Sequence, residues 1–344
     1  MKVLQLMAGA AAGGAETFFA RLALALHHRG ISQTLIIRPE PTREQILRDA
    51  GINILTCRYG GVLDFSTKWV LQREIEHFKP DIVLTWMNRA SSLCPVSSPH
   101  RPFPHLGTPR GYYDPKYYNR CDHLLVTTDD LAQFYAGHGW NVEDLSVIPN
   151  FAPYEPMKAI EREAQDTPKD VNLLLALGRF HENKGFDTLI EALVQLPDTF
   201  LWLGGAGPLE RQLKKLAKKL GVLDRIRFLG WRNDVPALLA AADVFVCSSR
   251  HEPFGNIVIE AWMHDVPIVA AASEGPSALI EDEVTGLLID VDSSGALAES
   301  IRQLVDDPRL ATRLAVAGKR RYETYYAEDV VLPQYIDLFE RLAS

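Results

Sequence analysis

The sequence is poor in cysteine and contains no long apolar run, and both shortages exclude classes of protein. Its 344 residues include four cysteines, without a Cys-x-x-Cys pair or the spacing of a zinc site. No window has the apolar length of a membrane-spanning helix, and the apolar start at 1–7 is too short for a signal peptide. We therefore expect a cytoplasmic protein. Peripheral contact with the membrane surface is compatible with this sequence.

Positive charges are fewer than negative ones. The chain has 36 Lys and Arg against 44 Asp and Glu, a net charge of -8, which argues against nucleic acid as a partner. Residues 1–152 carry 15 basic and 14 acidic side chains, whereas the rest of the chain carries 21 and 30. A membrane-facing surface is therefore easier to place in the first half.

Short apolar runs alternate with helical patterns along most of the chain, which is typical of parallel βαβ units. At about 150 residues per domain, the length predicts two such domains. Prolines keep residues 91–118 irregular, so we expect a long functional loop there. Residues 152–169 have the composition of a linker. Strands are expected at 2–7, 34–37, 52–57, 81–85, 123–127, 145–148, 173–176, 200–203, 226–229, 244–247 and 268–271.

The strongest motif runs from Ser248 to Glu260, where a strand ends in a loop and a helix begins near Asn256. A helix start offers backbone N–H groups and a positive dipole end to an anion. Glu252 and Glu260 add two carboxylates that suit ligand hydroxyls. A sugar nucleotide carries both phosphate and hydroxyls.

A second motif, Gly178 to Gly185, places Arg179 and Lys184 at another strand end. Two cations there suit a diphosphate, although a solvated loop with unrelated charges has the same pattern. The turns at 13–16 and 204–208 are also rich in glycine. The turn at 13–16 lacks the Gly-x-Gly-x-x-Gly spacing of a dinucleotide site, and a tight turn between strand and helix is the simple alternative to a binding role. The turn at 204–208 is interpreted first as structural, with the base of a nucleotide resting on it as the alternative.

Together these segments resemble the retaining glycosyltransferases of family 4, including bacterial enzymes of lipopolysaccharide and surface-polysaccharide synthesis. The resemblance covers essentially the whole chain. It rests on the segments 13–16, 147–150, 178–185, 204–208, 228–231 and the Glu-x7-Glu element 252–260. The resemblance implies the α/β GT-B fold, in which two Rossmann-like doubly wound domains face each other across a cleft. The implied domains are 1–152 with the C-terminal helix 326–344, on the acceptor side, and 153–325, which binds the donor.

The resemblance also implies the roles of individual residues in a hexosyl transfer from a UDP- or GDP-sugar. Glu252 is the implied catalytic group that holds the transferred sugar, and Glu260 holds the ribose. The implied donor-binding residues are Gly14, Arg179, Lys184, Arg232, Phe254, Gly255, Asn256, Ile257 and Glu260.

The acceptor side is implied to use Arg110, Tyr112 and Asn150, with a glycan or lipid-linked acceptor as partner. Many relatives carry an active-site histidine in the N-terminal domain. His105 is the candidate for it, although the family places this residue after a strand. His100 is its local rival, and an exposed loop histidine is the simpler reading of both.

No metal or other cofactor is expected, because Arg and Lys neutralise the leaving diphosphate. Asp290-Val291-Asp292 has the spacing of the metal motif of another glycosyltransferase class, but it follows a strand end, which favours a solvated turn. Three other functions stay open. They are a sugar-nucleotide 2-epimerase of the same fold, a glycoside hydrolase with paired carboxylates, and a non-catalytic sugar-nucleotide-binding protein.

Overall fold

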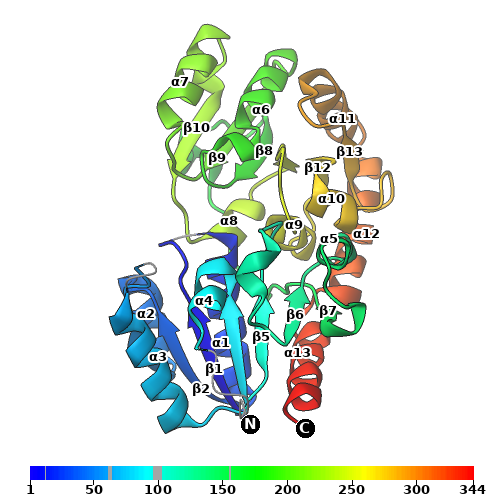
Figure 1. The fold of residues 1–344 in the computed structure, drawn as a ribbon. Helices are drawn as coiled ribbons and strands as arrows, with labels where there is room; N and C mark the ends of the chain where they lie inside the picture. Colours follow the sequence, from blue (N-terminus) through cyan, green and yellow to red (C-terminus); the bar gives the residue numbers. More distant parts are fainter. Residues whose placement is uncertain (12, 61–63, 96–102, 155) are drawn as a thin grey trace. The chain divides into compact units, whose positions relative to one another are not determined.

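The structure, a computed structural model, describes residues 1–11, 13–60, 64–95, 103–154 and 156–344 (Figure 1). The chain divides into two compact units. The N-terminal unit comprises residues 1–151 and 328–344, and the C-terminal unit comprises 152–327. The expected domain boundaries differ from these limits by one or two residues.

The N-terminal unit is built on a parallel sheet. Its strands are β1 (Lys2–Met7), β2 (Ser32–Ile37), β3 (Asn53–Thr56), β4 (Ile82–Trp86), β5 (His105–Thr108), β6 (His123–Val126) and β7 (Leu145–Val147). They pair in the order β3-β2-β1-β4-β5-β6-β7, and every printed pairing is parallel. This order reverses between β1 and β4, as in a doubly wound sheet.

Helices cover both faces of this sheet. They are α1 (Gly14–His28), α2 (Pro41–Asp49), α3 (Phe65–Phe78), α4 (Met87–Leu93), α5 (Asp129–Gly137), α13 (Glu328–Ala343) and the short 3-10 helices η1 (Pro115–Tyr118) and η2 (Val142–Asp144). Phe18 and Leu22 of α1 share one core with Tyr335 of α13. Leu71 of α3 and Ala90 of α4 belong to a core on the other face. Apolar residues three or four positions apart form the buried stripe of each helix.

The expectation of one irregular segment over 91–118 is wrong. The end of α4, the whole of β5 and η1 fall within it. The four-residue strand β5 lies between Pro104 and Pro109, so these prolines flank the strand and remove no hydrogen bond from its interior. The expectation of a loop, which rested on the prolines, therefore missed the strand that joins β4 to β6 in the sheet.

The C-terminal unit repeats this architecture. Its strands are β8 (Asn172–Leu177), β9 (Thr199–Gly204), β10 (Ile226–Gly230), β11 (Val244–Cys247), β12 (Ile268–Ala271) and β13 (Leu287–Ile289), in the order β10-β9-β8-β11-β12-β13. Its helices are α6 (Phe186–Ala192), α7 (Glu210–Lys219), α8 (Val235–Leu239), α9 (Asn256–Met263), α10 (Glu274–Leu279), α11 (Ser294–Asp306) and α12 (Pro308–Tyr325), with the 3-10 helices η3 (Arg162–Gln165), η4 (Glu182–Lys184), η5 (Leu193–Gln195) and η6 (Leu223–Arg225).

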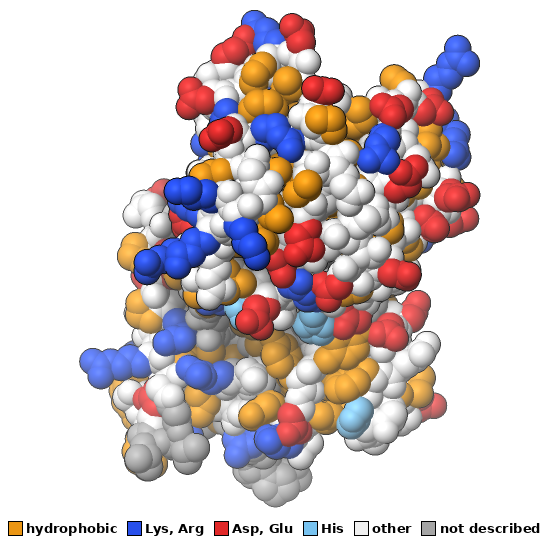
Figure 2. All heavy atoms as spheres, turned by 90° about the horizontal axis from the view of Figure 1, so that it is seen from above, with side chains coloured by type: hydrophobic (Ala, Val, Ile, Leu, Met, Phe, Trp, Pro, Cys, Tyr) orange, Lys and Arg blue, Asp and Glu red, His pale blue; other side chains and the backbone are white. Residues whose placement is uncertain are grey.

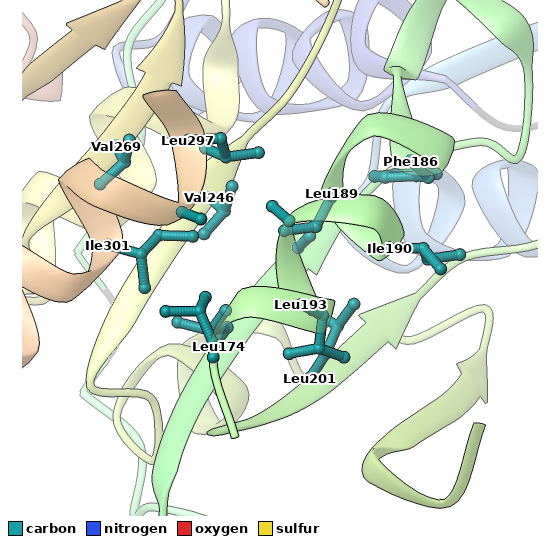
Figure 3. Packing of buried hydrophobic residues seen from close by; sticks show 14 of the residues in the cluster. Leu174, Phe186, Leu189, Ile190, Leu193, Leu201, Val246, Val269, Leu297 and Ile301 are labelled. Atoms are coloured by element: carbon teal, nitrogen blue, oxygen red, sulfur yellow. The ribbon is translucent and has the colours of Figure 1, made fainter. Parts of the chain in front are cut away.

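One core of this unit is shown in Figure 3. Leu189 and Leu193, from α6 and η5, lie close to Leu174 of β8, and Leu297 of α11 approaches Val246 of β11. Burying each of these side chains contributes about 1.5–3 kcal/mol. The packing holds α6 and α11 against the strands of this sheet.

Both units are therefore Rossmann-like parallel sheets covered by helices, which confirms the predicted α/β class. Among the described helices, none is long and apolar enough to cross a membrane. On the face that Figure 2 shows, basic and acidic side chains are interspersed. The predicted cleft between the units stays a prediction.

Candidate active site

Strands β8 and β11 lie side by side at the point where the strand order of the C-terminal sheet reverses. The chain continues from β8 to β9 and β10 on one side, and from β11 to β12 and β13 on the other. Open α/β sheets bind ligands at this point, beyond the carboxyl ends of the strands. The loops that leave β8 and β11 there are 178–185 and 248–255. The first carries the cations Arg179 and Lys184, and the second carries the carboxylate of Glu252.

Gly185 allows these two loops to touch. Its φ is +58°, and a Cβ atom at this position would lie 2.1 Å from the carbonyl oxygen of Ser248. The Ser248 hydroxyl donates to the Lys184 carbonyl over 2.9 Å. Only glycine fits such a close approach in a left-handed conformation. The contact brings Lys184 next to Glu252, 68 positions further along the chain.

Lys184 and Glu252 form an ion pair between Nζ and Oε2. Their side chains are largely buried, with 24% and 16% of their surface exposed. Burial alone would lower the pKa of Lys184, but the Glu252 carboxylate outweighs burial and the pKa is raised. Lys184 therefore stays charged at neutral pH. Arg179, in the same loop, has an exposed side chain.

Helix α9 begins directly after the loop that carries Glu252. Gly255 precedes the helix with a φ of +93° and is buried, as is Phe254. Asn256 and Ile257 form the first turn, where the positive end of the helix dipole lies. Glu260, one turn later, is only 9% exposed. The structure thus gathers most of the predicted donor residues around one anion-favouring helix start.

Arg232 follows β10 at the same edge of the sheet, and its guanidinium is held by a neighbour. Its Nε and Nη2 donate to the two carboxylate oxygens of Asp234 over 2.8 and 2.5 Å. This hydrogen bonding to Asp234 raises the pKa of Arg232. A contact between Arg232 and a nucleotide base would therefore compete with Asp234.

Arg250 ties three loops of this edge together, and the sequence did not single it out. It donates from Nη1 to the carbonyl of Glu182 over 2.8 Å, and from Nη2 to the carboxylate of Asp187 over 2.7 Å. Its Nε donates to Asp292 over 2.5 Å. These partners lie 42 to 68 positions away. No local motif signals such a brace, because its partners lie in η4, in the first turn of α6 and in the turn after β13.

Asp292 is thus held by Arg250, and it also accepts from the Thr188 hydroxyl over 3.2 Å. It lies in the turn after β13, with its side chain 54% exposed. Across the residues that the structure describes, no three His, Cys, Asp or Glu side chains gather closely enough to hold a metal ion.

In the N-terminal unit, the glycine turn before α1 encloses a carboxylate. Glu16 is 7% exposed, and its Oε1 accepts from the Ala10 amide over 2.7 Å. A Cβ atom at Gly13 would lie 2.3 Å from Oε2 of Glu16. Arg43 donates to the Ala10 carbonyl over 3.0 Å. The turn that leads into Gly14, the first residue of α1, is therefore braced from inside. The predicted contact of Gly14 with the donor stays a prediction.

Two of the predicted acceptor-side residues meet in the N-terminal unit. Arg110 donates from Nη1 to the side-chain oxygen of Asn150 over 2.7 Å, although 40 positions separate them. The guanidinium carbon lies 4.9 Å from the Phe18 ring and 4.4 Å from the Trp86 ring, as in cation–π pairs. Arg110 adopts a left-handed φ of +62° at the carboxyl end of β5. Asn150 itself is 4% exposed.

Tyr112, the third predicted acceptor-side residue, is engaged with α5. Its hydroxyl donates to the Asp130 carboxylate, and its ring packs edge-on against Phe134 at 5.2 Å between centroids. The aromatic residues of this segment thus form a small core of their own.

His105 is not placed as expected. It begins β5, at the amino end of the strand, whereas ligands of such sheets bind beyond the carboxyl end. It is fully buried, with Nδ1 2.9 Å from the Arg120 carbonyl oxygen and Nε2 2.9 Å from the Thr85 hydroxyl. These contacts fit a core histidine and contradict an exposed loop histidine. The rival His100 lies outside the described residues.

Known families match both halves of the chain. Residues 12–155 match "Glycosyltransferase Family 4", and residues 157–321 match "Glycosyl transferases group 1". The lipopolysaccharide core biosynthesis glycosyltransferase LpsD of Rhizobium meliloti is 36% identical over 342 residues, covering 99% of this chain and 98% of that protein. LpsE of the same organism is 37% identical over 339 residues and 95% of each chain.

Solved structures agree in fold. A glycosyltransferase from Rickettsia africae superposes with a TM-score of 0.88 at 20% identity, covering 99% of this chain and 98% of that one. Anabaena Alr3699/HepE in complex with UDP and glucose gives 0.87 at 21% identity, covering 99% and 100%. The chain therefore belongs to the family 4 glycosyltransferases, and its two units are the Rossmann-like domains of the GT-B fold.

Proposed function

We propose that this glycosyltransferase moves a hexosyl group from a nucleotide diphosphate sugar to a hydroxyl of a growing lipopolysaccharide core or surface polysaccharide, with retention at the anomeric carbon. The observation that carries the proposal is the Lys184–Glu252 ion pair beside the start of α9. It joins a cation suited to a diphosphate to a carboxylate suited to sugar hydroxyls. The two relatives that match along nearly the whole chain are named as lipopolysaccharide core enzymes.

In the proposed complex, the donor diphosphate lies at the start of α9, near the backbone of Gly255, Asn256 and Ile257. Lys184 and Arg179 neutralise the diphosphate. Glu260 holds the ribose and Glu252 the hydroxyls of the transferred sugar. Because Lys184 and Glu252 form an ion pair, the proposed donor contacts replace one ion pair by two new interactions. Part of the cost of separating the pair is thereby offset.

The proposed reaction needs no general base from the protein. The bond between the anomeric carbon and the phosphate oxygen breaks, and a bond from that carbon to the acceptor oxygen forms on the same face. The acceptor proton passes to the leaving phosphate oxygen. Lys184 and the α9 dipole stabilise the charge that develops on the diphosphate, and Glu252 orients the sugar.

The donor assignment predicts a selective thermal shift. A ligand that binds only the folded protein raises Tm by mass action, by about 2.7 kcal/mol of stability at 100 times its Kd. We expect UDP-, GDP- or ADP-sugars of one base to raise Tm, and Arg179→Ala with Lys184→Met to abolish the shift. A panel measured by differential scanning fluorimetry checks this.

The control for the thermal-shift panel is Lys214→Met, because Lys214 pairs with Glu210 on the exposed surface of α7. It should shift like the wild type. Absence of any shift with the wild type would contradict the donor site. Turnover of the sugar nucleotide without acceptor, followed by NMR, would indicate an epimerase instead.

For the acceptor side, we propose a lipid-linked glycan bound by the N-terminal unit. Arg110 and Asn150 form a polar pair at the carboxyl edge of that sheet, where ligands of parallel sheets bind. The guanidinium suits an acceptor phosphate or carboxylate.

A lipid-linked acceptor requires the enzyme to reach a membrane surface. Exposed side chains of α3 are suited to that contact. We define the α3 aromatic stripe as Phe65 and Trp69, which are 70% and 62% exposed and share one face of the helix. Lys68 Nζ lies 5.8 Å from the Phe65 ring, and the Arg73 guanidinium lies 5.1 Å from the Trp69 ring. Aromatic rings beside cations are typical of surfaces that enter the headgroup region of anionic membranes.

The double variant Phe65→Ser with Trp69→Ser is expected to lower binding to phosphatidylglycerol-containing vesicles about tenfold, because two interfacial rings are lost. Co-sedimentation with such vesicles, and with pure phosphatidylcholine, measures this. Ile46→Ser with Val142→Ser removes two other exposed apolar side chains of the same unit and should bind like the wild type. Equal binding of all three proteins would contradict the membrane role of the stripe.

A further inference from the structure

Glu274, the first residue of α10, holds two consecutive residues of the loop after β11. Its Oε1 lies 2.6 Å from Nδ1 of His251, and its Oε2 accepts from the backbone amide of Glu252 over 3.2 Å. The two hydrogen-bond donors, the Glu252 amide and the His251 ring, lie 22 and 23 positions earlier in the chain. One carboxylate thus fixes both the ring beside Glu252 and the backbone of Glu252 itself.

The neighbouring residue completes this attachment. The Gly275 amide donates to the Glu252 carbonyl over 2.7 Å. A Cβ atom at Gly275 would lie 2.2 Å from the Phe254 carbonyl oxygen and 2.6 Å from that of Glu252. Both backbone polar groups of Glu252 are therefore held by the start of α10. From this fixed backbone, the Glu252 side chain points to Lys184.

Glu274 suits this task because it carries its charge at neutral pH. Burial on its own would raise the pKa of Glu274, but hydrogen bonds from backbone amides and from His251 outweigh it, so the pKa is lowered. An ionised carboxylate offers acceptors to both donors at once. Hydrogen bonds to a charged acceptor are also stronger than neutral ones.

We propose that Glu274 is a positioning residue for Glu252, which sets the carboxylate of Glu252 against the hydroxyls of the transferred sugar. Glu274 acts through the backbone of Glu252 and through His251, without touching the donor. This proposal rests on the proposed role of Glu252. The proposal makes different predictions for the two parts of the donor. Binding of the sugar depends on Glu274, whereas the diphosphate contacts come from Lys184, Arg179 and α9 and do not.

The first test needs no donor. Hydrogen exchange of the Glu252 amide, resolved by NMR or by peptides spanning 250–256, should be about tenfold faster in Glu274→Ala, since that amide loses its acceptor. Glu274→Gln keeps one side-chain oxygen as acceptor and should restore slow exchange. Glu281→Ala, an exposed carboxylate just beyond α10, is the matched control. Unchanged exchange in Glu274→Ala would overturn the proposal.

The second test separates sugar from nucleotide by titration calorimetry. UDP-glucose and GDP-mannose are each compared with UDP or GDP alone. Glu274→Ala should weaken binding of the sugar nucleotide about tenfold and leave the Kd of the nucleoside diphosphate within about twofold. Added to Glu252→Ala, it should have almost no further effect, because both act through one carboxylate.

The outcomes of the calorimetry are distinct. Equal loss of nucleoside diphosphate and sugar nucleotide binding in Glu274→Ala would mean a general structural role and would overturn the positioning role. If the wild type binds none of the four probes, the proposed donor site fails, while the exchange experiment still decides whether Glu274 holds the Glu252 backbone.

Discussion

Glu252→Gln is expected to lower kcat/KM by about 100-fold or more with the fold intact, because the neutral amide loses the charge that holds Lys184 and the sugar hydroxyls. Lys184→Met should cause a similar loss, since its ammonium is the largely buried cation paired with Glu252. The two effects should not add, because the side chains act as one pair. Initial rates with radiolabelled sugar nucleotide, together with circular dichroism of each variant, measure this.

The matched control is the exposed pair of Lys214 and Glu210, whose side chains are 47% and 42% exposed. Exposed pairs of this kind are worth about 0–1 kcal/mol. Lys214→Met and Glu210→Gln should therefore keep wild-type rates and stability. Full activity of a folded Glu252→Gln protein would refute the proposed site.

The second large effect is expected at Gly185. Gly185→Ala forces a Cβ atom to within 2.1 Å of the Ser248 carbonyl oxygen, at a left-handed φ of +58°. The loops after β8 and β11 then have to separate, which removes the Ser248 hydroxyl bond to Lys184. We expect a loss of about 3 kcal/mol or more, seen as a fall in Tm of roughly 6–12 °C for a domain of this size.

Gly221→Ala is the control for Gly185→Ala. Gly221 also has a left-handed φ, +72°, but a Cβ atom there meets nothing within 4 Å. This variant therefore carries the backbone strain alone, about 1–2 kcal/mol. Thermal unfolding of both proteins separates strain from collision, and a Tm of Gly185→Ala equal to that of Gly221→Ala would show that the loops do not need their close contact.

Local patterns were enough to predict much of the fold. Apolar runs of four to six residues, each followed by an amphipathic helix, predict parallel βαβ units because the alternation reflects burial along one element at a time. The motif from Ser248 to Glu260 was likewise readable, since its strand end, loop and helix start are contiguous in the chain.

The errors arose where a neighbour in space overrides the local sequence. Residues 105–108 lie between prolines and predict a loop, yet β4 and β6 supply pairing partners on both sides and β5 forms. The same pairing buries His105 at the amino end of the strand and away from the edge where ligands bind.

Sequence alone determined the α/β class, the family and the residue types of the candidate donor site, because periodicity and motif spacing are local properties of the chain. Only the tertiary structure decided which of those residues meet. Lys184 reaches Glu252, Arg110 reaches Asn150 and Glu274 reaches the Glu252 backbone because the parallel strands of each sheet end at one edge. Partners that lie 22 to 68 positions apart share no local pattern, and only the packing of the sheets brings them within hydrogen-bond distance.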